Sequence, residues 1–403
     1  MKYIVMLGDG MADYPIDDLD GKTPLEAAAT PNMDYMAQHG SVGMAQTIPA
    51  GMPPGSDTAN MSVMGYDPKK YYSGRSPLEA VSMGIDLKDD DVTFRCNLVC
   101  LSDEAEYTEK TMVDYSSGEI STEESRELIA ALQSVIDPAE MQLYCGISYR
   151  HCLVMNHAET GTELTPPHDI SLKPIKEHLP TGLYGRKLLD MMKRSYDVLK
   201  DHPVNVARRK AGKNPANSMW FWGEGTKPRF DTIEKLYGVK GGVVCAVDLI
   251  KGLGKCAGMR TIDVEGATGG MVTNYRGKAE AALKLLAEGC DFVYIHVEAP
   301  DECGHHGDAA AKIAAIEAID RDMIALIREK LAERGEEFSM LIAPDHPTPV
   351  SIRTHTGEPI PFVIYRSASE GAPNAPAYSE KEARKTGLFL EQGPMLMKML
   401  INK

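Results

Sequence analysis

Several features that would place a chain in a special class are missing from this sequence of 403 residues. The eight cysteines form no C-x-x-C pair and no repeating framework, which indicates reduced and mostly buried thiols. No apolar run reaches the roughly 20 residues that a membrane helix needs, and the apolar start is too short for a signal peptide. No Walker A motif, internal repeat or low-complexity segment is present. We therefore expect a soluble, cytoplasmic protein without a membrane partner.

Positive charge is also in short supply. The chain has 43 Lys and Arg against 58 Asp and Glu, which gives a formal net charge of −15. This excess argues against nucleic acid or an anionic membrane as the main partner. A phosphorylated substrate would also be repelled, so an enzyme for such a substrate would need metals or clustered arginines to reverse the field locally.

The length predicts two domains, because a single hydrophobic core normally stops growing below 403 residues. The character of the sequence changes between residues 86 and 178, which begin with an acidic run and end in a proline-rich stretch. The elements expected there are a strand over Val92–Leu101, a helix over Thr122–Val135 and a strand over Met141–Val154. We predict that residues 86–178 form a smaller α/β domain, inserted into a core made of residues 1–85 and 179–403.

Short apolar runs that end in polar residues recur in this predicted core. The first covers residues 3–7 and ends at Asp9. Others are Val243–Val247 before Asp248, Phe292–Val297 before Glu298 and Asp301, Met340–Ala343 before Asp345 and His346, and Pro361–Tyr365. Helical patterns at Thr30–His39, Gly277–Glu288 and Ala309–Arg334 lie between them. This alternation predicts an α/β fold with a mostly parallel sheet, whose ligands bind just beyond the strand ends.

Carboxylates and imidazoles gather after two of these predicted strands. Asp301 and His305 are four residues apart, so one helical turn would direct both side chains to the same point. Asp345 and His346 are adjacent, so in an extended chain they diverge and could serve two neighbouring cations, and His355 follows closely. Each residue alone is equally well explained as a solvated loop residue or helix cap. The whole set favours a site for divalent metal ions.

Ser56 follows Pro-Pro-Gly and precedes a short predicted helix. Free backbone N–H groups at a helix N-terminus favour a negative oxygen and an incoming phosphoryl group. An isolated serine in this position is usually an ordinary N-cap. The hypothesis that Ser56 is a nucleophile therefore depends on the metal ligands, since a bound cation would remove its proton.

Taken together, these segments resemble a known family. The matching segments are Met6–Asp13 (MLGDGMAD), Gly21–Asn32 (GKTPLEAAATPN), Pro54–Asn60 (PGSDTAN), Asp301–His305 (DECGH) and Pro344–His346 (PDH). In this order they are similar to the short, archaeal-type cofactor-independent phosphoglycerate mutases of the alkaline phosphatase superfamily. The resemblance covers nearly the whole chain and is densest in its outer segments.

The resemblance implies a metal-dependent isomerase of glycolysis, with an alkaline-phosphatase-like core and an inserted cap domain. It would interconvert 3-phosphoglycerate and 2-phosphoglycerate through phosphorylated Ser56. The implied ligands are Asp9, Ser56, Asp345 and His346 for one divalent ion, and Asp301, His305 and His355 for a second. Manganese is the first choice for both ions, with magnesium and zinc as alternatives.

Basic residues that could hold the small phosphorylated carboxylate substrate occur in two clusters. One is Arg150 with His151, and the other contains Arg208, Arg209 and Lys213. A plain surface patch explains each cluster equally well. The segment Asn217–Gly225 contains both tryptophans, and its expected role is core packing.

Three alternatives stay open at this stage. A homoserine-kinase-like phosphotransferase would keep Ser56 and the metals and change the cap residues. A phosphatase would differ in letting water reach the phosphoserine. A non-catalytic metal-binding protein would leave the serine unused. The sequence does not define the oligomeric state.

Overall fold

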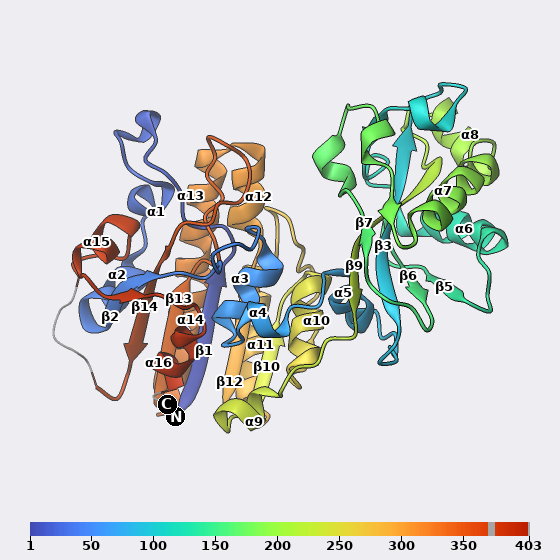
Figure 1. Ribbon diagram of the computed structural model, residues 1–403. Helices are drawn as coiled ribbons and strands as arrows, with labels where there is room; N and C mark the ends of the chain where they lie inside the picture. Colours follow the sequence, from blue (N-terminus) through green and yellow to red (C-terminus); the bar gives the residue numbers. More distant parts are fainter. Residues whose placement is uncertain (370–374, 402–403) are drawn as a thin grey trace. The chain divides into compact units, whose positions relative to one another are not determined.

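The computed structural model describes residues 1–369 and 375–401 (Figure 1). The chain divides into two compact units. Unit 1 comprises Met1–Tyr72 and Arg229–Lys403, and unit 2 comprises the inserted segment Ser73–Pro228.

The inserted unit is longer at both ends than the expected residues 86–178. Its sheet explains the difference, because helix α5 (Ser76–Ser82) and strand β9 (Ser218–Thr226) both pack on strand β3 (Val92–Leu101). β9 forms an antiparallel ladder with β3 that runs from Val92 to Val99. The segments on either side of the expected domain therefore complete its sheet.

Unit 1 is built on an eight-stranded sheet in the order β11-β10-β12-β1-β13-β14-β2-β15. The strands are β1 Lys2–Gly8, β2 Ser41–Ala45, β10 Gly241–Val244, β11 Arg260–Ile262, β12 Phe292–Val297, β13 Phe338–Ala343, β14 Ile360–Arg366 and β15 Phe389–Leu390. Among the described strands of this eight-stranded sheet, β14 alone runs antiparallel to both neighbours. The predicted α/β fold with a mostly parallel sheet is confirmed.

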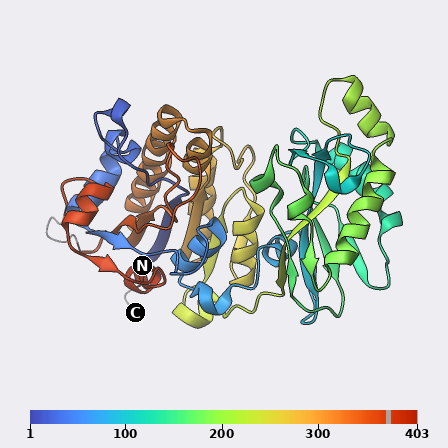
Figure 2. The ribbon, with the colours of Figure 1, turned by 45° about the horizontal axis from the view of Figure 1, so that its top comes forward.

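Helices cover both faces of this sheet (Figure 2). They are α1 Pro24–Ala27, α2 Pro31–His39, α3 Ser56–Val63, α4 Pro68–Tyr71, α9 Ile233–Tyr237, α10 Asp248–Cys256, α11 Tyr275–Ala287, α12 Ala299–His306, α13 Ala309–Ala318, α14 Ala325–Glu333, α15 Glu380–Lys385 and α16 Met395–Ile401. On one face, Ile4 and Met6 of β1 join a buried cluster with residues of α11, α13 and α14. Alternate residues of a strand face opposite sides, so the other β1 side chains point to the second helical layer.

The helix predicted over Ala309–Arg334 is present but not uniform. A π-helical stretch, Ile319–Ile324, separates α13 from α14. Asp320 in this stretch accepts hydrogen bonds from the backbone N–H groups of Asn32 and Met33 at 3.0 and 2.8 Å. Its carboxylate thereby satisfies free donors at the start of α2.

Unit 2 contains a five-stranded antiparallel sheet of β3, β4 (Met112–Asp114), β5 (Met141–Tyr144), β6 (Arg150–Met155) and β9. Helices α5, α6 (Thr122–Leu132), α7 (Gly185–Leu199) and α8 (Pro203–Lys210) accompany it, with a small ribbon of β7 (Thr162–Glu163) and β8 (Thr181–Gly182).

The single strand expected over Met141–Val154 is wrong, because β5 and β6 are separate strands that pair antiparallel. Gly146 allows the tight turn between them, since a Cβ there would lie 2.1 Å from the carbonyl oxygen of Arg150.

The core of unit 2 contains the tryptophan segment. Trp220 is fully buried together with Phe94 and Leu188, so the predicted packing role of this segment is confirmed. All eight cysteines are free thiols, and six of them are buried. Within the described residues, no helix combines the length and apolar character needed to cross a membrane.

Candidate active site

The carboxyl ends of three neighbouring strands of unit 1 bring the predicted ligands together. β1 lies between β12 and β13, with Gly8 beside Val297 and Leu7 beside Ala343. Asp9 is the first residue after β1, and its backbone N–H donates to the Val297 carbonyl at 2.9 Å. The parallel arrangement thus places the turns after residues 8, 297 and 343 at one edge of the sheet.

Asp9, Asp345 and His346 form the first cluster, and all three are fully buried. His346 Nε2 lies 3.6 Å from Asp9 Oδ1 and 3.4 Å from Asp345 Oδ2. The predicted divergence of Asp345 and His346 is therefore wrong, because the chain turns after β13 and both side chains approach Asp9.

Three donors fix the Asp345 carboxylate. Its Oδ1 accepts from the backbone N–H groups of Gly10 and His346 at 3.1 and 2.9 Å. Its Oδ2 accepts from Asn60 Nδ2 at 2.7 Å, and Asn60 is held in turn by the Tyr294 hydroxyl at 2.7 Å. Sequence reasoning assigned no role to Asn60 or Tyr294, since a buried amide inside a helix carries no signal of its own.

Asp301, His305 and His355 form the second cluster. Asp301 and His305 lie one turn apart on α12, with His305 Nε2 3.2 Å from Asp301 Oδ2, as the spacing predicted. His355 Nε2 lies 3.4 Å from Asp301 Oδ1 and 3.0 Å from His305 Nε2. The Thr348 hydroxyl, which the sequence did not single out, donates to Asp301 Oδ1.

Ser56 is the first residue of α3 and is half-buried. Its hydroxyl oxygen lies 3.1 Å from His346 Nε2, within hydrogen-bond distance. The predicted location at a helix N-terminus is confirmed, and the hydroxyl contacts the first cluster directly.

The two clusters differ in their electrostatics. Burial, reinforced by the charges of Asp345 and Asp301, raises the pKa of Asp9 well above its usual value. Burial alone would also raise the pKa of Asp301, but hydrogen bonds from His305 and His355 outweigh it and hold that pKa well below the usual range. Burial alone would lower the pKa of His305, but the hydrogen bond to Asp301 and the charge of Asp301 raise it to about 9. Burial lowers the pKa of His346.

A further pair of residues, His296 and Glu298, lies against Asp9. His296 Nε2 is 2.9 Å from Asp9 Oδ2, and His296 Nδ1 is 3.6 Å from Glu298 Oε2. Burial lowers the pKa of His296 to about 3, and burial with the charges of Asp301 and Glu302 raises that of Glu298 to about 8. His296 could not be recognised as a site residue from the sequence, because it lies inside an apolar strand.

The donor atoms of this region fit divalent cations. Three groups of three side chains place one ligand atom each within 4.8 Å of the others: Asp9, Asp345 and His346; Asp301, His346 and His355; and Asp9, His296 and Glu298. Both Asp9 oxygens are buried and have no hydrogen-bond partner among the described residues. Buried polar atoms are normally satisfied, so the chemistry of this carboxylate fits a divalent cation as its partner.

The turns after β1 and β12 approach each other closely at Gly10. This residue has φ +60°, and a Cβ built on it would lie 2.6 Å from Asp301 Oδ1 and 2.8 Å from Asp301 Cα. Glycine is therefore required both by the backbone conformation and by the lack of space.

The predicted substrate residues of unit 2 differ in their burial and in their hydrogen-bond partners. Arg150 is half-buried in β6, and its Nε is buried without a hydrogen-bond partner in the described chain. His151 is buried, its Nδ1 accepts from the Gly146 N–H at 3.1 Å, and burial with the nearby Arg150 charge lowers its pKa to about 3.

The second predicted cluster does not converge on one point. Arg208 is buried and donates to Asn214 O at 2.9 Å, to Ser117 O and to the Glu124 carboxylate, so internal partners occupy its guanidinium. Arg209 and Lys213 are exposed.

A cationic group that sequence reasoning missed lies on the β3–β9 face of unit 2. The guanidinium of buried Arg95 lies 4.1 Å from the Trp222 ring centre, and that of Arg75 lies 5.8 Å from it. Both arginines contact Glu79, at 2.8 and 3.2 Å. Burial and the charges of Arg75 and Arg150 lower the pKa of Arg95 to about 10, although Glu79 opposes the shift.

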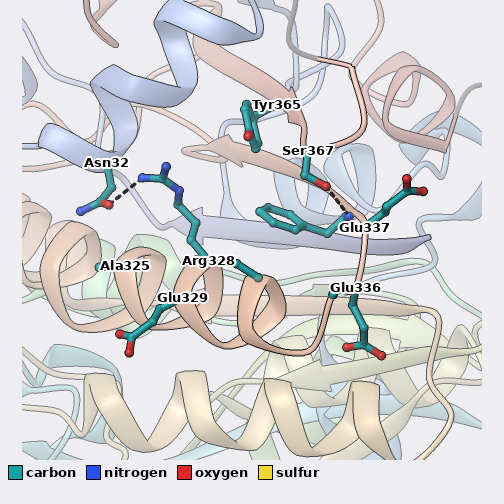
Figure 3. A pocket seen from close by; sticks show the side chains of 11 residues that line it. Asn32, Ala325, Arg328, Glu329, Glu336, Glu337, Tyr365 and Ser367 are labelled. Atoms are coloured by element: carbon teal, nitrogen blue, oxygen red, sulfur yellow. Dashed lines mark hydrogen bonds between the residues drawn. The ribbon is translucent and has the colours of Figure 1, made fainter.

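A hollow of about 490 Å³ opens at the opposite, amino end of β13 (Figure 3). Arg328 donates to Asn32 Oδ1 at 2.8 Å there, and Ser367 Oγ accepts from the Phe338 N–H at 2.8 Å. Glu329, Glu336 and Glu337 also line it. The predicted ligands and Ser56 do not line this hollow, so the strand-end clusters remain the candidate active site.

Comparison with known proteins agrees with this geometry. The family model for 2,3-bisphosphoglycerate-independent phosphoglycerate mutase matches residues 37–205. A protein of that name from Methanosarcina barkeri is 50% identical over 402 residues, covering 100% of this chain and 99% of its own. A Geobacter sulfurreducens protein, described as a probable enzyme of that kind, is 49% identical and covered in full.

Two solved structures also match over the whole chain. A Pyrococcus horikoshii protein superimposes with a TM-score of 0.81 at 32% identity, covering 100% of this chain and 97% of its own. A cofactor-independent phosphoglycerate mutase from Thermoplasma acidophilum gives a TM-score of 0.64 at 27% identity, covering 100% and 99%. The chain therefore belongs to the family of 2,3-bisphosphoglycerate-independent phosphoglycerate mutases.

Proposed function

We propose that the chain interconverts 3-phosphoglycerate and 2-phosphoglycerate through a phosphoserine at Ser56, as a cytoplasmic step of glycolysis. The observation that carries this proposal is the position of the Ser56 hydroxyl, 3.1 Å from His346 Nε2 at the edge of the first cluster. Full-length relatives named as phosphoglycerate mutases support the choice of substrate.

Two divalent ions would complete the site. Asp9, Ser56, Asp345 and His346 would hold one ion, and Asp301, His305 and His355 the other. Manganese is the first ion to test, since a mixture of carboxylate, imidazole and hydroxyl ligands suits it, with magnesium and zinc as alternatives. When bound, the ions would lower the pKa of the serine hydroxyl and neutralise charge on the phosphoryl oxygens.

The residues of the chain then have separate roles. Ser56 is the first residue of α3, where the positive end of the helix dipole favours a negatively charged nucleophile. Asn60 and the Gly10 N–H hold Asp345 in one orientation, so that its oxygens do not need to reorganise during the transfer. The phosphoryl group passes to Ser56, and the retained glycerate receives it on its other hydroxyl.

The acidic substrate also needs cations, and unit 2 offers them. We propose that Arg150, whose Nε has no hydrogen-bond partner in the described chain, binds the carboxylate or phosphate of the substrate. Planar guanidinium groups bind both anions in a bidentate manner, and burial strengthens the interaction. Arg208 is left out of this proposal because its hydrogen bonds are already made within the unit.

The deciding experiment assays the purified chain with manganese on 3-phosphoglycerate and, separately, on homoserine with ATP. Conversion of 3-phosphoglycerate to 2-phosphoglycerate, with a phosphopeptide containing Ser56 in the quenched reaction, is the expected result. Activity confined to homoserine would favour the kinase alternative. Release of inorganic phosphate as the main product would favour a phosphatase.

A further inference from the structure

His296 is a buried imidazole that the proposed function leaves unused. It lies in β12 and is 1% exposed. Its neighbour on β1 is Leu7, which comes two residues before Asp9 in the chain. Histidine is rarely buried without hydrogen bonds, yet neither ring nitrogen of His296 has a hydrogen-bond partner among the described residues. The neighbours of the ring therefore indicate what it does.

The two oxygens of Asp9 face different partners. Oδ1 lies on the side of the first cluster, 3.6 Å from His346 Nε2. Oδ2 lies on the opposite side, 2.9 Å from His296 Nε2. This division leaves Oδ1 for a metal ion and assigns Oδ2 to the imidazole.

The other edge of the ring faces a second carboxylate. His296 Nδ1 lies 3.6 Å from Glu298 Oε2, an atom that is itself buried without a hydrogen-bond partner in the described chain. One ligand atom each of Asp9, His296 and Glu298 lies within 4.8 Å of the others, but the two ring nitrogens contact different carboxylates, Nε2 that of Asp9 and Nδ1 that of Glu298. A bridge between Asp9 and Glu298 accounts for this arrangement better than a third set of metal ligands.

The backbone of His296 is also anchored. Lys278 of α11 is fully buried, and its ammonium group donates to the His296 carbonyl oxygen at 3.2 Å. β12 is paired on both edges, with β1 and with β10. The imidazole therefore extends from a rigid strand rather than from a loop.

We propose that His296 is a positioning residue for Asp9, which it orients through Oδ2 while Glu298 orients the ring from the other side. An ionised Asp9 can only accept, so the proton belongs on Nε2. At 2.9 Å the two atoms are within hydrogen-bond distance, although the angle in this conformation falls outside the range for a hydrogen bond. The inference rests on the proposed function, because it assumes that Asp9 is a metal ligand.

The test measures Mn²⁺ binding to the full chain by isothermal titration calorimetry and counts the bound ions by elemental analysis. His296→Ala and His296→Asn should weaken one of two Mn²⁺ sites by roughly 10- to 100-fold, the usual effect of losing a hydrogen bond to a metal ligand. His296→Gln should lose less than about tenfold, because its amide nitrogen can take the place of Nε2. Glu298→Gln should give an intermediate loss, since an amide can still contact the ring.

A matched control separates positioning from packing. His151→Ala removes another buried imidazole, in unit 2, and should leave Mn²⁺ affinity unchanged. The Gln and Asn variants should unfold at the same temperature without metal, so that a difference between them reports on Asp9 and not on packing. If His296→Ala does not fold, the comparison of Gln with Asn still tests the proposal.

Two results would overturn it. Mn²⁺ affinity that stays within about twofold of the parent in both the Asn and the Gln variants would show that His296 does not orient Asp9. Three bound ions in the parent, one of them lost with His296, would make His296 a ligand instead. These readouts need no mutase activity, so failure of the proposed function would appear separately, as an inactive parent that still binds two ions.

Discussion

Each unit contains a buried charge beside others of the same sign, and the two buried charges are stabilised in different ways. In unit 2, Arg95 is buried but pairs with Glu79 at 2.8 Å and lies over Trp222. In unit 1, Asp9 is buried beside Asp345 and Asp301, and its oxygens have no hydrogen-bond partner among the described residues. Arg95 thus has an oppositely charged partner within its own unit, whereas the Asp9 carboxylate fits a divalent cation as its partner.

This difference follows from the cost of burying charge. A buried ion is tolerated when it is paired and hydrogen-bonded, and otherwise its pKa shifts towards the neutral form. Unit 2 meets the pairing requirement for Arg95 with Glu79, although burial still lowers the pKa of Arg95 to about 10. Unit 1 meets it for Asp301, whose pKa is lowered by two histidines, but not for Asp9, whose pKa is raised.

The largest expected effect comes from removing Ser56, the nucleophile that we propose for the anionic site. Ser56→Ala should reduce mutase turnover by roughly 10³-fold or more, because no other group can accept the phosphoryl. Turnover is measured by coupled assay, and the fold by thermal unfolding. The matched control is Ser62→Ala in the same helix, where the hydroxyl donates to Thr47 O at 2.6 Å and has no assigned catalytic role. Near-normal turnover in Ser56→Ala would refute the covalent route.

Removal of metal should lower the stability of unit 1 but not that of unit 2. Chelation should abolish activity and lower the stability of unit 1 by about 3 kcal/mol, the contribution of an ion present at about 100 times its dissociation constant. Hydrogen exchange measured by mass spectrometry should show the loss in peptides of residues 1–72 and 229–401. Peptides of residues 73–228 serve as the internal control. Equal loss of protection in both units would contradict the comparison.

Arg150 of unit 2 should affect substrate binding rather than metal binding. Arg150→Ala should raise the KM for 3-phosphoglycerate roughly 10- to 100-fold, as expected for a charge-assisted hydrogen bond of about 1.5–3 kcal/mol. Exposed Arg209 provides the matched control, and Arg209→Ala should leave KM within about twofold. An equal change in both variants would point to general charge attraction in place of a defined site.

The smallest effect concerns pH and Glu298. Burial, with the charges of Asp301 and Glu302, raises the pKa of Glu298 to about 8, above its unfolded value near 4.5. The folded state therefore binds the proton more tightly, and the stability of the metal-depleted chain should fall as pH rises from about 5 to 8. Partial exposure of the side chain limits the effect of Glu298 to roughly 2 kcal/mol.

Thermal unfolding in the presence of a chelator, repeated across this pH range, measures the effect. Glu298→Gln should flatten the curve over the same range. An identical slope in parent and variant would show that Glu298 does not titrate there.

Much of the anionic site could be predicted from the sequence, because its ligands follow strand ends. Asp9, Asp301 and Asp345 each come after an apolar run, and parallel strands bring such positions to one edge of the sheet. His296 could not be found this way, since its role depends on the neighbouring strand and not on its own surroundings in the sequence.

The cationic group was harder to predict for the same reason. Arg75, Arg95 and Trp222 are distant in sequence and meet only when β9 pairs with β3. Arg208 and Arg209 look equivalent in the sequence, yet one is buried against Glu124 and the other is exposed. The boundaries of unit 2 were missed because the last strand of its sheet follows the prolines that suggested its end.

The contact at Gly10 also limits how this site can change during evolution. Position 10 has no space for even a methyl group beside Asp301, and its backbone adopts a conformation that favours glycine. The turn that carries Asp9, one proposed metal ligand, therefore packs directly against Asp301, another proposed ligand. Because the Asp301 Cα and the Thr348 hydroxyl also close this space, loss of the Asp301 carboxylate alone would not make room for a side chain at position 10, and glycine should persist there in homologues.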